Sequence, residues 1–301
     1  MEKRITVFTS TYNRGRLLHR LYESLLRQTD KSFKWLVIDD GSTDDTKKIV
    51  GNWIAEGKLE IEYIYKKNGG LHTGYNKAIE IIDTELSMCI DSDDWLTDNA
   101  IEIILKHWDK NKSSQYAGLI GLDIDNQNHL VGDYLPDKKS INPVMLLAKK
   151  CKGDKKYVVR SECYKKVAPM PTFENEKNFN PHYLIIKLCK DYEFLILNKP
   201  LCVVDYQVDG MTANIFSQYI NSPNSFAELR KAIMELNIPF NYLIKTVVHY
   251  TSSSIIAGQK NIISKSPRKI PTILMFPVGY LLSKYIRKNA NKLLKVSKVL
   301  N

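Results

Sequence analysis

Acidic residues gather where an apolar, strand-like segment ends, and their spacing suits the binding of a cation. Asp91 and Asp93, with Asp94 beside them, follow the apolar segment 86–90. Carboxylates this close repel one another unless a positive charge compensates them. Mg²⁺ or Mn²⁺ takes a few carboxylates together with phosphate oxygens. The spacing therefore predicts a metal–phosphate site, although Asp93 would serve equally well as a cap of the next helix.

A second acidic pair, Asp39 and Asp40, follows the nearly continuous apolar run 33–38. Gly41 behind the pair can adopt the positive φ of a tight turn, so the pair is also explained as turn-forming residues. In the functional interpretation, Asp40 accepts hydrogen bonds from a nucleotide base or a ribose. The residue types alone leave both interpretations open.

The elements around these acids alternate between strand-like and helix-like patterns over the first 125 residues. Strand-like runs at 5–8, 33–38, 59–65 and 86–90 are separated by segments with apolar residues at helical spacing. This alternation predicts an α/β fold with a mainly parallel sheet flanked by helices. Ligands of such sheets bind beyond the carboxyl ends of the strands. Both acidic clusters and the polar turn 10–13 follow strands, so we expect all three at one rim.

The rest of the chain carries weaker patterns. Strand-like segments are expected at 116–124, 157–160, 194–197 and 201–204, a helix at 183–189 and a loop at 169–181. From about residue 216 onward the pattern is helical to the end of the chain. We therefore expect a helical extension that follows the α/β part.

Taken in order, the polar clusters resemble those of the family 2 glycosyltransferases, which have the Rossmann-like GT-A fold. The matching segments are 10–14, 37–44, 68–76, 90–94 and 206–212. Each segment is common by itself, but their order and spacing together are difficult to obtain by chance. The resemblance implies a GT-A catalytic domain over 1–215, followed by a C-terminal extension over 216–301.

The resemblance also implies a role for individual residues. The implied donor-binding residues are Ser10, Thr11, Tyr12, Arg14, Asp40, Asn76 and Asp91. The first turn and Asp40 would hold the base, most often uracil, and Asp91 would lie near the ribose. Asp93, with Asp94, would bind the Mn²⁺ or Mg²⁺ that bridges the sugar-nucleotide diphosphate. Members of the family transfer the sugar in one in-line displacement, which inverts the anomeric configuration.

The catalytic base is where this chain departs from the family's pattern. Relatives place an Asp or Glu in a loop before a helix, whereas the corresponding place here holds Pro181 and His182. His182 is a competent base near pH 7, and Glu174 and Glu176 lie upstream in the same loop. A lone histidine at a helix start is equally well a surface residue. Without an acid here, the chain is alternatively inactive, or a non-catalytic nucleotide-sugar-binding partner subunit of another glycosyltransferase.

The net charge of +11 comes entirely from the end of the chain. No acidic residue follows Glu235, while eleven Lys and Arg lie between Lys245 and Lys298. The remaining 33 basic residues are balanced by the 33 acidic ones. A general nucleic-acid-binding protein would carry its basic residues on the main domain, so nucleic acid is not the expected partner. The pattern favours a basic C-terminal module with another anionic partner.

The segment of about 270–300 narrows the choice of that partner, because it has the pattern of an amphipathic helix. Val278, Leu281, Ile286 and Ala290 fall on one side at helical spacing, and lysines fill the other. A helix of this kind lies in the interface of an anionic membrane. The alternative is that it packs on the main domain or on a second subunit.

These observations combine into one predicted function. We expect a metal-dependent, inverting hexosyl- or N-acetylhexosaminyltransferase that uses a UDP-linked donor and a glycan or lipid-linked acceptor of bacterial surface polysaccharide biosynthesis. The five scattered cysteines favour a reducing cytoplasm. The basic amphipathic segment adds the expectation of peripheral attachment to the inner face of the cell membrane. Homo-oligomerisation stays open. A nucleotidyltransferase is a weaker alternative, because no glycine-rich phosphate loop follows the first strand.

Overall fold

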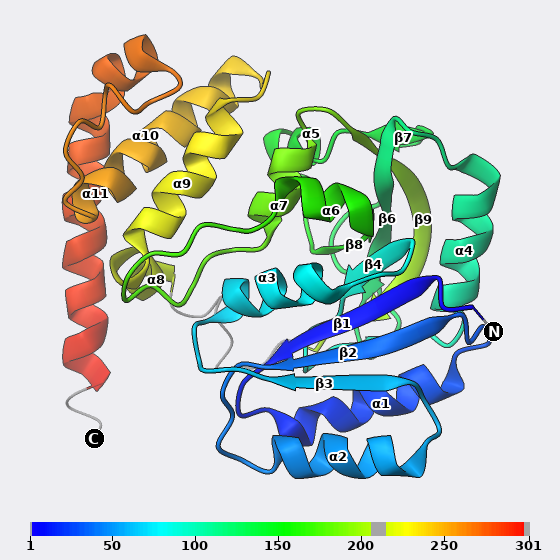
Figure 1. Ribbon diagram of the computed structural model, residues 1–301. Coiled ribbons are helices and arrows are strands. Elements are labelled where there is room, and N and C mark those ends of the chain that lie inside the picture. The colour runs from blue at the N-terminus through cyan, green and yellow to red at the C-terminus, as the bar shows by residue number, and fades with distance from the viewer. Residues whose placement is uncertain (1, 206–214, 298–301) are drawn as a thin grey trace. The chain divides into compact units, whose positions relative to one another are not determined.

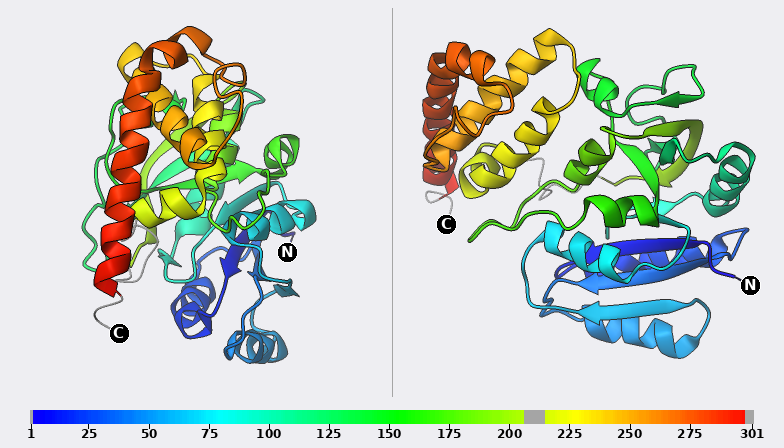
Figure 2. Two further views of the ribbon diagram at one scale, coloured as in Figure 1. Left: turned by 90° about the vertical axis from the view of Figure 1, so that its left-hand side faces the viewer. Right: turned by 45° about the horizontal axis from the view of Figure 1, so that its top comes forward.

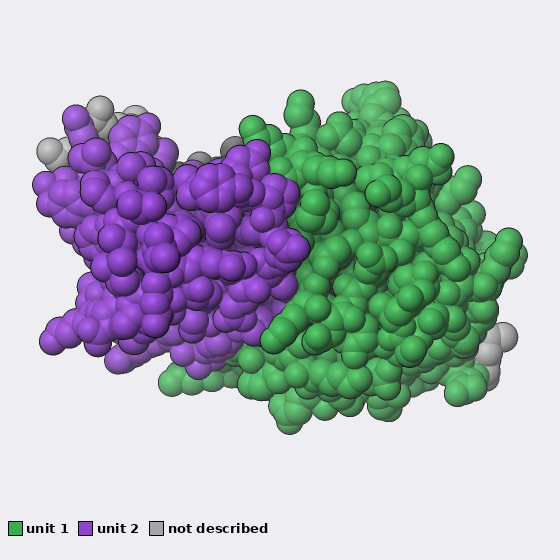
Figure 3. Space-filling view, turned by 90° about the horizontal axis from the view of Figure 1, so that it is seen from above, with its two compact units in different colours: residues 1–170, 188–207 green, residues 171–187, 208–301 purple. Residues whose placement is uncertain are grey.

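The computed structural model describes residues 2–205 and 215–297, and the chain separates into two compact units. Unit 1 comprises residues 1–170 and 188–207, and unit 2 comprises residues 171–187 and 208–301 (Figure 3). A compact unit is not by itself a catalytic domain. The predicted end of the catalytic domain near residue 215 therefore stays a prediction.

Unit 1 is built on a nine-stranded sheet in the order β3-β2-β1-β4-β8-β6-β9-β5, with β7 paired to β9 (Figure 1). The first four strands, β1 Ile5–Thr11, β2 Phe33–Asp39, β3 Ile61–Tyr65 and β4 Leu86–Cys89, are parallel. β8 Lys155–Arg160 runs antiparallel between β4 and β6 Tyr116–Ile124, and β9 Glu193–Val203 is parallel to β6. The short strands β5 Trp95–Leu96 and β7 Ser140–Ile141 run antiparallel to β9. The predicted mainly parallel sheet is confirmed.

Helices cover both faces of the parallel half of this sheet (Figure 1). They are α1 Leu18–Arg27, α2 Thr46–Glu56, α3 Leu71–Ile81 and α4 Ala100–Asn111, with the 3₁₀ turn Gly15–Leu17 before α1. Trp35 and Val37 of β2 pack into the core that α1, α2 and α4 share, while Leu36 and Ile38 pack with α3. A strand buried on both faces needs apolar residues at every position, which explains the continuous run 33–38.

Several elements differ from the sequence prediction. The two strands expected at 194–197 and 201–204 are one strand, β9, whose register against β6 shifts between Ile196 and Pro200. The Asn198 side chain in this irregularity bonds the backbone of Leu135 at 2.9 and 3.0 Å. The polar interruption is therefore a bulge in one strand and not a chain reversal. The helices α5 Val144–Ala148 and α6 Ser161–Val167 were not predicted.

Unit 2 is helical, as the sequence predicts. It contains most of α7 His182–Leu188 and the helices α8 Ile215–Asn221, α9 Pro223–Met234, α10 Phe240–Ile256 and α11 Lys269–Ser297. α10 packs against both α9 and α11, and α11 runs along one side of this group (Figure 2). Among the described residues, no helix is long and apolar enough to cross a bilayer.

Candidate active site at the carboxyl edge of the sheet

The turn after β4 carries the acidic cluster and meets the loop after β1, as the sequence predicts. The Arg14 guanidinium donates from Nη1 to Oδ2 of Asp93 at 2.8 Å, and both side chains are partly exposed. Asp91, two residues earlier in the turn, reaches solvent. The neighbouring parallel strands β1 and β4 thus bring Arg14 and the acidic turn together, although 79 residues separate Arg14 from Asp93.

The contacts of Asp94 differ from those expected of the metal ligand that the sequence suggested. Its Oδ1 accepts the backbone N–H of Asp205 at 3.3 Å, and its Oδ2 lies 3.6 Å from the ammonium of Lys156. The residue is buried, and both of its oxygens are engaged by the protein. Asp94 therefore anchors the acidic turn to β8 and to the end of β9. Asp93 and Asp91 are the better candidates for a metal.

Too few positive charges surround these buried carboxylates. Burial raises the pKa of Asp94 to about 7 and the pKa of Asp123, at the end of β6, to about 6. Both Asp123 oxygens are buried with no hydrogen-bond partner among the described residues. Burial by itself would lower the pKa of the Lys156 ammonium. The negative charges of Asp123, Asp94 and Asp91 outweigh burial and raise this pKa. Lys156, joined by Arg14 at Asp91, thus only partly offsets the burial and mutual repulsion of the three carboxylates.

Asp91 is exposed to solvent and also lies close to other charged side chains. Its side chain is exposed, yet the pKa of its carboxyl is raised, first by desolvation and then by the charge of Asp93, while Lys156 and Arg14 oppose the rise. Asp91 therefore has an open side from which a ligand can reach its carboxylate, while the protein surrounds the rest of the side chain.

Arg20 supports the acidic turn from α1. It donates to Oδ2 of Asp205 at 2.6 Å and lies over the Trp95 ring at 4.7 Å. It also reaches the backbone carbonyl of Asp93 at 3.4 Å. Arg20 was not predicted from the sequence, because a lone arginine in an amphipathic helix resembles an ordinary surface residue.

The loop after β1 is joined to the loop after β2 by Asn13. This residue has a positive φ of 52°, and its backbone N–H donates to Ser42 Oγ at 2.8 Å. Its side-chain oxygen accepts the backbone N–H of Thr43 at 2.7 Å. Tyr12 beside it is 49% exposed, whereas Thr11 is buried. These contacts hold the predicted donor-side turn in a fixed conformation and leave the Tyr12 ring accessible.

Asp40 organises the loop that follows β3. Its carboxylate accepts the backbone N–H groups of Gly69 at 2.9 Å and Gly70 at 2.7 Å, and it pairs with Lys66. The Asn68 amide donates to the same carboxylate at 3.2 Å. All these partners come from the protein, so Asp40 shapes the 66–70 loop. Its predicted contact with a nucleotide base stays a prediction.

Two other predicted donor-side residues have structural contacts. The Asn76 side chain accepts the backbone N–H of Met170 at 2.7 Å and donates to its carbonyl at 2.9 Å. Ser10 lies where α3 approaches β1, and a Cβ on Gly74 would fall 2.1 Å from Ser10 Oγ. Glycine at position 74 is therefore required for this close approach. Direct donor contacts of Ser10 and Asn76 remain predictions.

The three candidate bases all belong to unit 2, and one of them is unsuited to the role. The carboxylate of Glu176 is buried and accepts four hydrogen bonds of 2.7 to 2.9 Å from the backbone and side chains of Asn224 and Ser225. These contacts occupy its lone pairs and fix the first turn of α9. The expectation that Glu176 reaches in as a base is therefore corrected to a structural role.

His182 and Glu174 stay predictions as bases. His182 begins α7, where its backbone N–H donates to Asn180 Oδ1 at 2.9 Å, and Glu174 is exposed. Residues 206–212, the last segment of the family resemblance, lie outside the described residues.

Comparison with known proteins identifies the family. Residues 6–164, more than half of the chain, match the family model described as Glycosyl transferase family 2. The chain belongs to this family. A chondroitin synthase of Escherichia coli is 29% identical over 43% of this chain and 19% of its own length. The poly(ribitol-phosphate) beta-N-acetylglucosaminyltransferase TarP of Staphylococcus aureus is 29% identical over 40% of this chain and 38% of its own length. The chain thus spans less than half of these curated relatives.

Solved structures show the same fold at low sequence identity. The S. aureus TarS 1–349 structure in complex with UDP-GlcNAc has a TM-score of 0.59 and 15% identity, covering 95% of this chain and 92% of that chain. The mannosyltransferase PcManGT from Pyrobaculum calidifontis, in complex with GDP-Man and Mn²⁺, has a TM-score of 0.58 and 15% identity, covering 97% and 84%. The predicted GT-A fold is confirmed.

Proposed function

We propose that this family 2 glycosyltransferase moves a hexosyl or N-acetylhexosaminyl group from a UDP-linked donor to a glycan or lipid-linked acceptor, in bacterial surface polysaccharide biosynthesis. The TarP and chondroitin synthase relatives support a glycan-building role, and the TarS complex with UDP-GlcNAc supports a UDP-linked donor. The observation that carries the proposal is the meeting of Arg14 with the acidic turn at Asp93.

The charge at this edge of the sheet argues for a cation between protein and donor. A sugar-nucleotide diphosphate is negatively charged, and the carboxyls of Asp94 in the acidic turn and of Asp123 on β6 have raised pKa values, which shows that nearby cations compensate them incompletely. Direct approach of two negative groups is unfavourable at short range. A divalent cation bound by both removes this repulsion, which supports the use of Mn²⁺ or Mg²⁺.

The residues present fit a metal that is shared with the donor. Among the described residues, no cluster of three His, Cys, Asp or Glu side chains forms a closed metal site. Asp93 and the exposed Asp91 offer two carboxylates at one turn, and Mg²⁺-type ions commonly take one or two carboxylates plus substrate phosphates. When bound, the ion supplies positive charge that stabilises the departing diphosphate.

The chain's own residues set up the transfer around this point. Arg14 neutralises Asp93, and once displaced from that carboxylate its guanidinium would be able to pair with a donor phosphate. Lys156 and Arg20 hold the acidic turn in place through Asp94 and Asp205. His182, with Glu174 as the alternative, would take the proton of the acceptor hydroxyl during a single inverting displacement.

The missing acid at the base position also supports a second candidate, a non-catalytic nucleotide-sugar-binding subunit of another glycosyltransferase. Glu176 is fully engaged within unit 2, which leaves fewer groups able to act as a base. This candidate binds the donor but does not turn it over.

A panel of nucleotide sugars separates the two candidates. The purified protein is incubated with each sugar and Mn²⁺, with and without a glycan acceptor, and release of the nucleotide is measured. Acceptor-dependent release of UDP from one donor, reduced about a hundredfold or more in His182→Ala, supports catalysis by this chain. Donor binding without release for every donor and acceptor supports the non-catalytic subunit instead. Glu174→Gln serves as the matched test of the alternative base.

We also infer that the basic extension holds the enzyme at the cytoplasmic face of the membrane, where lipid-linked acceptors are assembled. All of the net positive charge lies after residue 235, and each basic residue near an anionic leaflet contributes about 1 kcal/mol. Assembly into a homo-oligomer is compatible with this location and stays open.

A further inference from the structure

One side of α11 packs inside unit 2 and is lined mainly by small residues. Thr272, Gly279, Ser283, Ile286 and Ala290 are buried on this side, at the alternating spacing of a helix seam. A Cβ on Gly279 would fall 2.6 Å from the Cβ of Thr251 in α10, so the two helices approach closely here. Ile286 and Ala290, which the sequence placed on the same apolar side as Val278 and Leu281, therefore belong to the packed seam.

The opposite side of α11 is apolar in its first half and exposed. Ile270, Ile273, Leu274, Val278, Leu281 and Tyr285 are between 47 and 72% exposed. The positions 270, 274, 278, 281 and 285 follow each other at intervals of three or four residues, which places them along one side of a helix. An exposed, continuous stripe of large apolar side chains is unusual on a protein surface and marks a site of interaction.

The next turns of the same helix are basic. Lys284, Arg287 and Lys288 are all exposed, and Lys284 lies 4.8 Å over the ring of Tyr280. No acidic residue occurs between 236 and 301, so this part of the chain cannot neutralise its own charge. The exposed side of α11 thus changes along its length: it is apolar from 270 to 281, and from 284 to 288 the basic side chains of Lys284, Arg287 and Lys288 surround Tyr285.

We propose that this exposed side of α11 is the surface that docks on an anionic lipid bilayer, with the apolar turns inserted at the headgroup boundary and the basic turns on lipid phosphates. The inference rests on the membrane location proposed above and names the surface that produces it. The phosphates of a nucleic acid would pair with the basic turns but would leave the exposed aliphatic stripe in water. A second copy of the chain would bring unpaired basic turns into one interface with no acid in 236–301 to compensate them.

Vesicle sedimentation of the full chain tests the proposal. Wild-type protein is expected to bind vesicles of phosphatidylglycerol and phosphatidylcholine, and to bind pure phosphatidylcholine at least about tenfold more weakly. Leu274→Glu with Leu281→Glu should weaken binding to the mixed vesicles at least about tenfold. Lys284→Glu with Lys288→Glu should weaken binding to the mixed vesicles about fivefold or more per residue at low salt, and this loss of binding should be smaller at high salt.

Matched controls come from α2 of unit 1. Ile54→Glu replaces an apolar residue that is 42% exposed, and Lys47→Glu with Lys48→Glu makes the same charge change on two lysines outside α11. These variants should bind vesicles nearly as the wild type does. Circular dichroism checks that each α11 variant keeps its helical content, which we expect because the altered side chains are exposed.

Two outcomes would overturn the proposal. Vesicle binding of the α11 variants that equals that of the controls would exclude this surface. Light scattering measures the oligomeric state. If the wild type is a dimer and Leu274→Glu is a monomer, a second copy of the chain covers the stripe. Nucleotide release is measured in parallel on the same proteins. Absent release with intact vesicle binding contradicts the proposed sugar transfer alone, and the reverse pattern contradicts the membrane location and its docking surface alone.

Discussion

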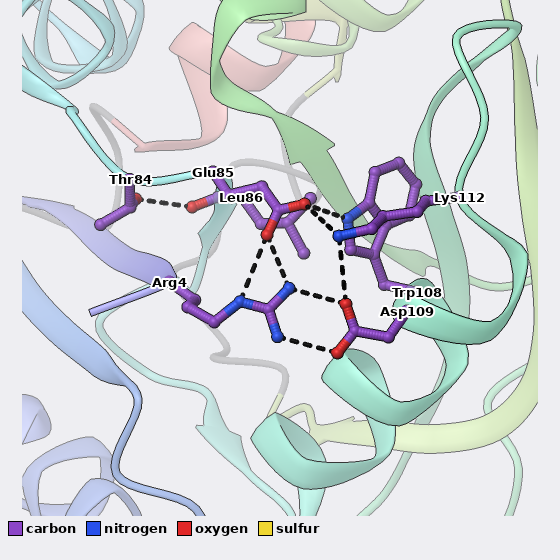
Figure 4. Close-up of polar contacts among 7 residues, drawn as sticks. All are labelled: Arg4, Thr84, Glu85, Leu86, Trp108, Asp109 and Lys112. Carbon is purple, nitrogen blue, oxygen red and sulfur yellow. Dashed lines mark hydrogen bonds and ion pairs between the residues drawn. The ribbon is translucent and has the colours of Figure 1, made fainter. Parts of the chain in front are cut away.

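Two charged clusters lie at opposite edges of the sheet in unit 1, and they shift the pKa values of their carboxyls in opposite directions. At the amino edge, Arg4 binds Asp109 through two hydrogen bonds of 2.8 Å and Glu85 through bonds of 2.6 and 3.3 Å (Figure 4). Trp108 and Lys112 also donate to Glu85. Hydrogen bonding to Arg4 lowers the pKa of Asp109 to about 2. Burial opposes ionisation of Glu85, but its hydrogen bonds outweigh burial and lower its pKa as well.

At the carboxyl edge the carboxylates respond in the opposite way. The pKa of Asp94 rises to about 7 and that of Asp123 to about 6, in both cases chiefly through burial. The comparison separates two uses of acidic residues. A depressed pKa marks carboxylates whose charge the protein compensates with its own cations, whereas a raised pKa here marks carboxylates that are buried with incomplete compensation.

The largest effect is expected from Asp93→Asn, which removes a predicted metal ligand but keeps the shape of the side chain. Sugar transfer should fall by at least about a hundredfold, because the leaving diphosphate loses its compensating charge. The measurement is nucleotide release with Mn²⁺. Asp98→Asn, an exposed acid that pairs with Arg27, is the control and should leave transfer unchanged. Normal transfer by Asp93→Asn would contradict the metal assignment.

The compensated cluster is tested by Arg4→Met. Removing the cation leaves Glu85 and Asp109 close together, and the free energy of unfolding at pH 7 should fall by about 1–2 kcal/mol. Because the folded pKa of Asp109 lies below its ordinary value, its stabilisation is present above about pH 4 and is lost as the pH falls towards 2. Denaturant unfolding at pH 7 and about pH 3 measures the free energy of unfolding of wild type and variant.

The loss caused by Arg4→Met should therefore be smaller at the acidic pH than at pH 7. Arg27→Met, which breaks an exposed pair, provides the control and should cost less than about 0.5 kcal/mol. Equal losses for the two variants would mean that the amino-edge network adds nothing beyond an ordinary surface pair.

Arg14→Met sharpens the comparison, because the Arg14 guanidinium pairs with Asp93 and competes with any other cation there. Removing this competing cation should strengthen Mn²⁺ binding in the absence of donor by about three- to tenfold. With UDP present the gain should shrink, since the variant lacks a group that could pair with a phosphate. Titration with Mn²⁺ monitored by electron paramagnetic resonance measures the Mn²⁺ dissociation constant without and with UDP. Arg16→Met, an exposed neighbour, is the control. Unchanged or weaker Mn²⁺ binding without donor would contradict the competition.

The smallest effect concerns the pH dependence of stability in Asp94→Asn. The folded pKa of Asp94 lies above its ordinary value, so the folded protein binds the extra proton and loses stability as the pH rises from about 4 to 7. Asparagine does not ionise, so the stability of the variant should rise relative to that of wild type between about pH 5 and pH 8. Unfolding curves at the two values test this. A relative loss of stability over the same interval would contradict the raised pKa.

The fold was predictable because its signals are local. The apolar run 33–38 and the helical spacing after it depend on neighbouring residues, and the polar residues after parallel strands must converge at one edge. β9 was predicted as two strands because a bulge at Asn198 interrupts the apolar pattern as a turn would. The short elements α5 and α6 lack enough residues for a periodic signal.

The site was predictable only in part, because long side chains from distant segments complete it. The place of Asp93 followed from its position after β4, whereas Arg14 was implied by the family resemblance, and the roles of both stay predictions. Lys156 and Asp123 lie on β8 and β6 within ordinary strand patterns, and their proximity to the acidic turn depends on the order β4-β8-β6. The antiparallel insertion of β8 has no signal in the sequence. Lys66 was also missed, although its place directly after β3 follows the same edge rule that found Asp40.

The most direct test of the central claim is the Mn²⁺ affinity of the full chain with and without UDP. If the carboxyl edge is an incomplete cation site that the donor diphosphate completes, UDP should strengthen Mn²⁺ binding at least about tenfold in wild type, and this gain should disappear in Asp93→Asn. An equal gain in wild type and Asp93→Asn, or no gain in wild type, would contradict the account.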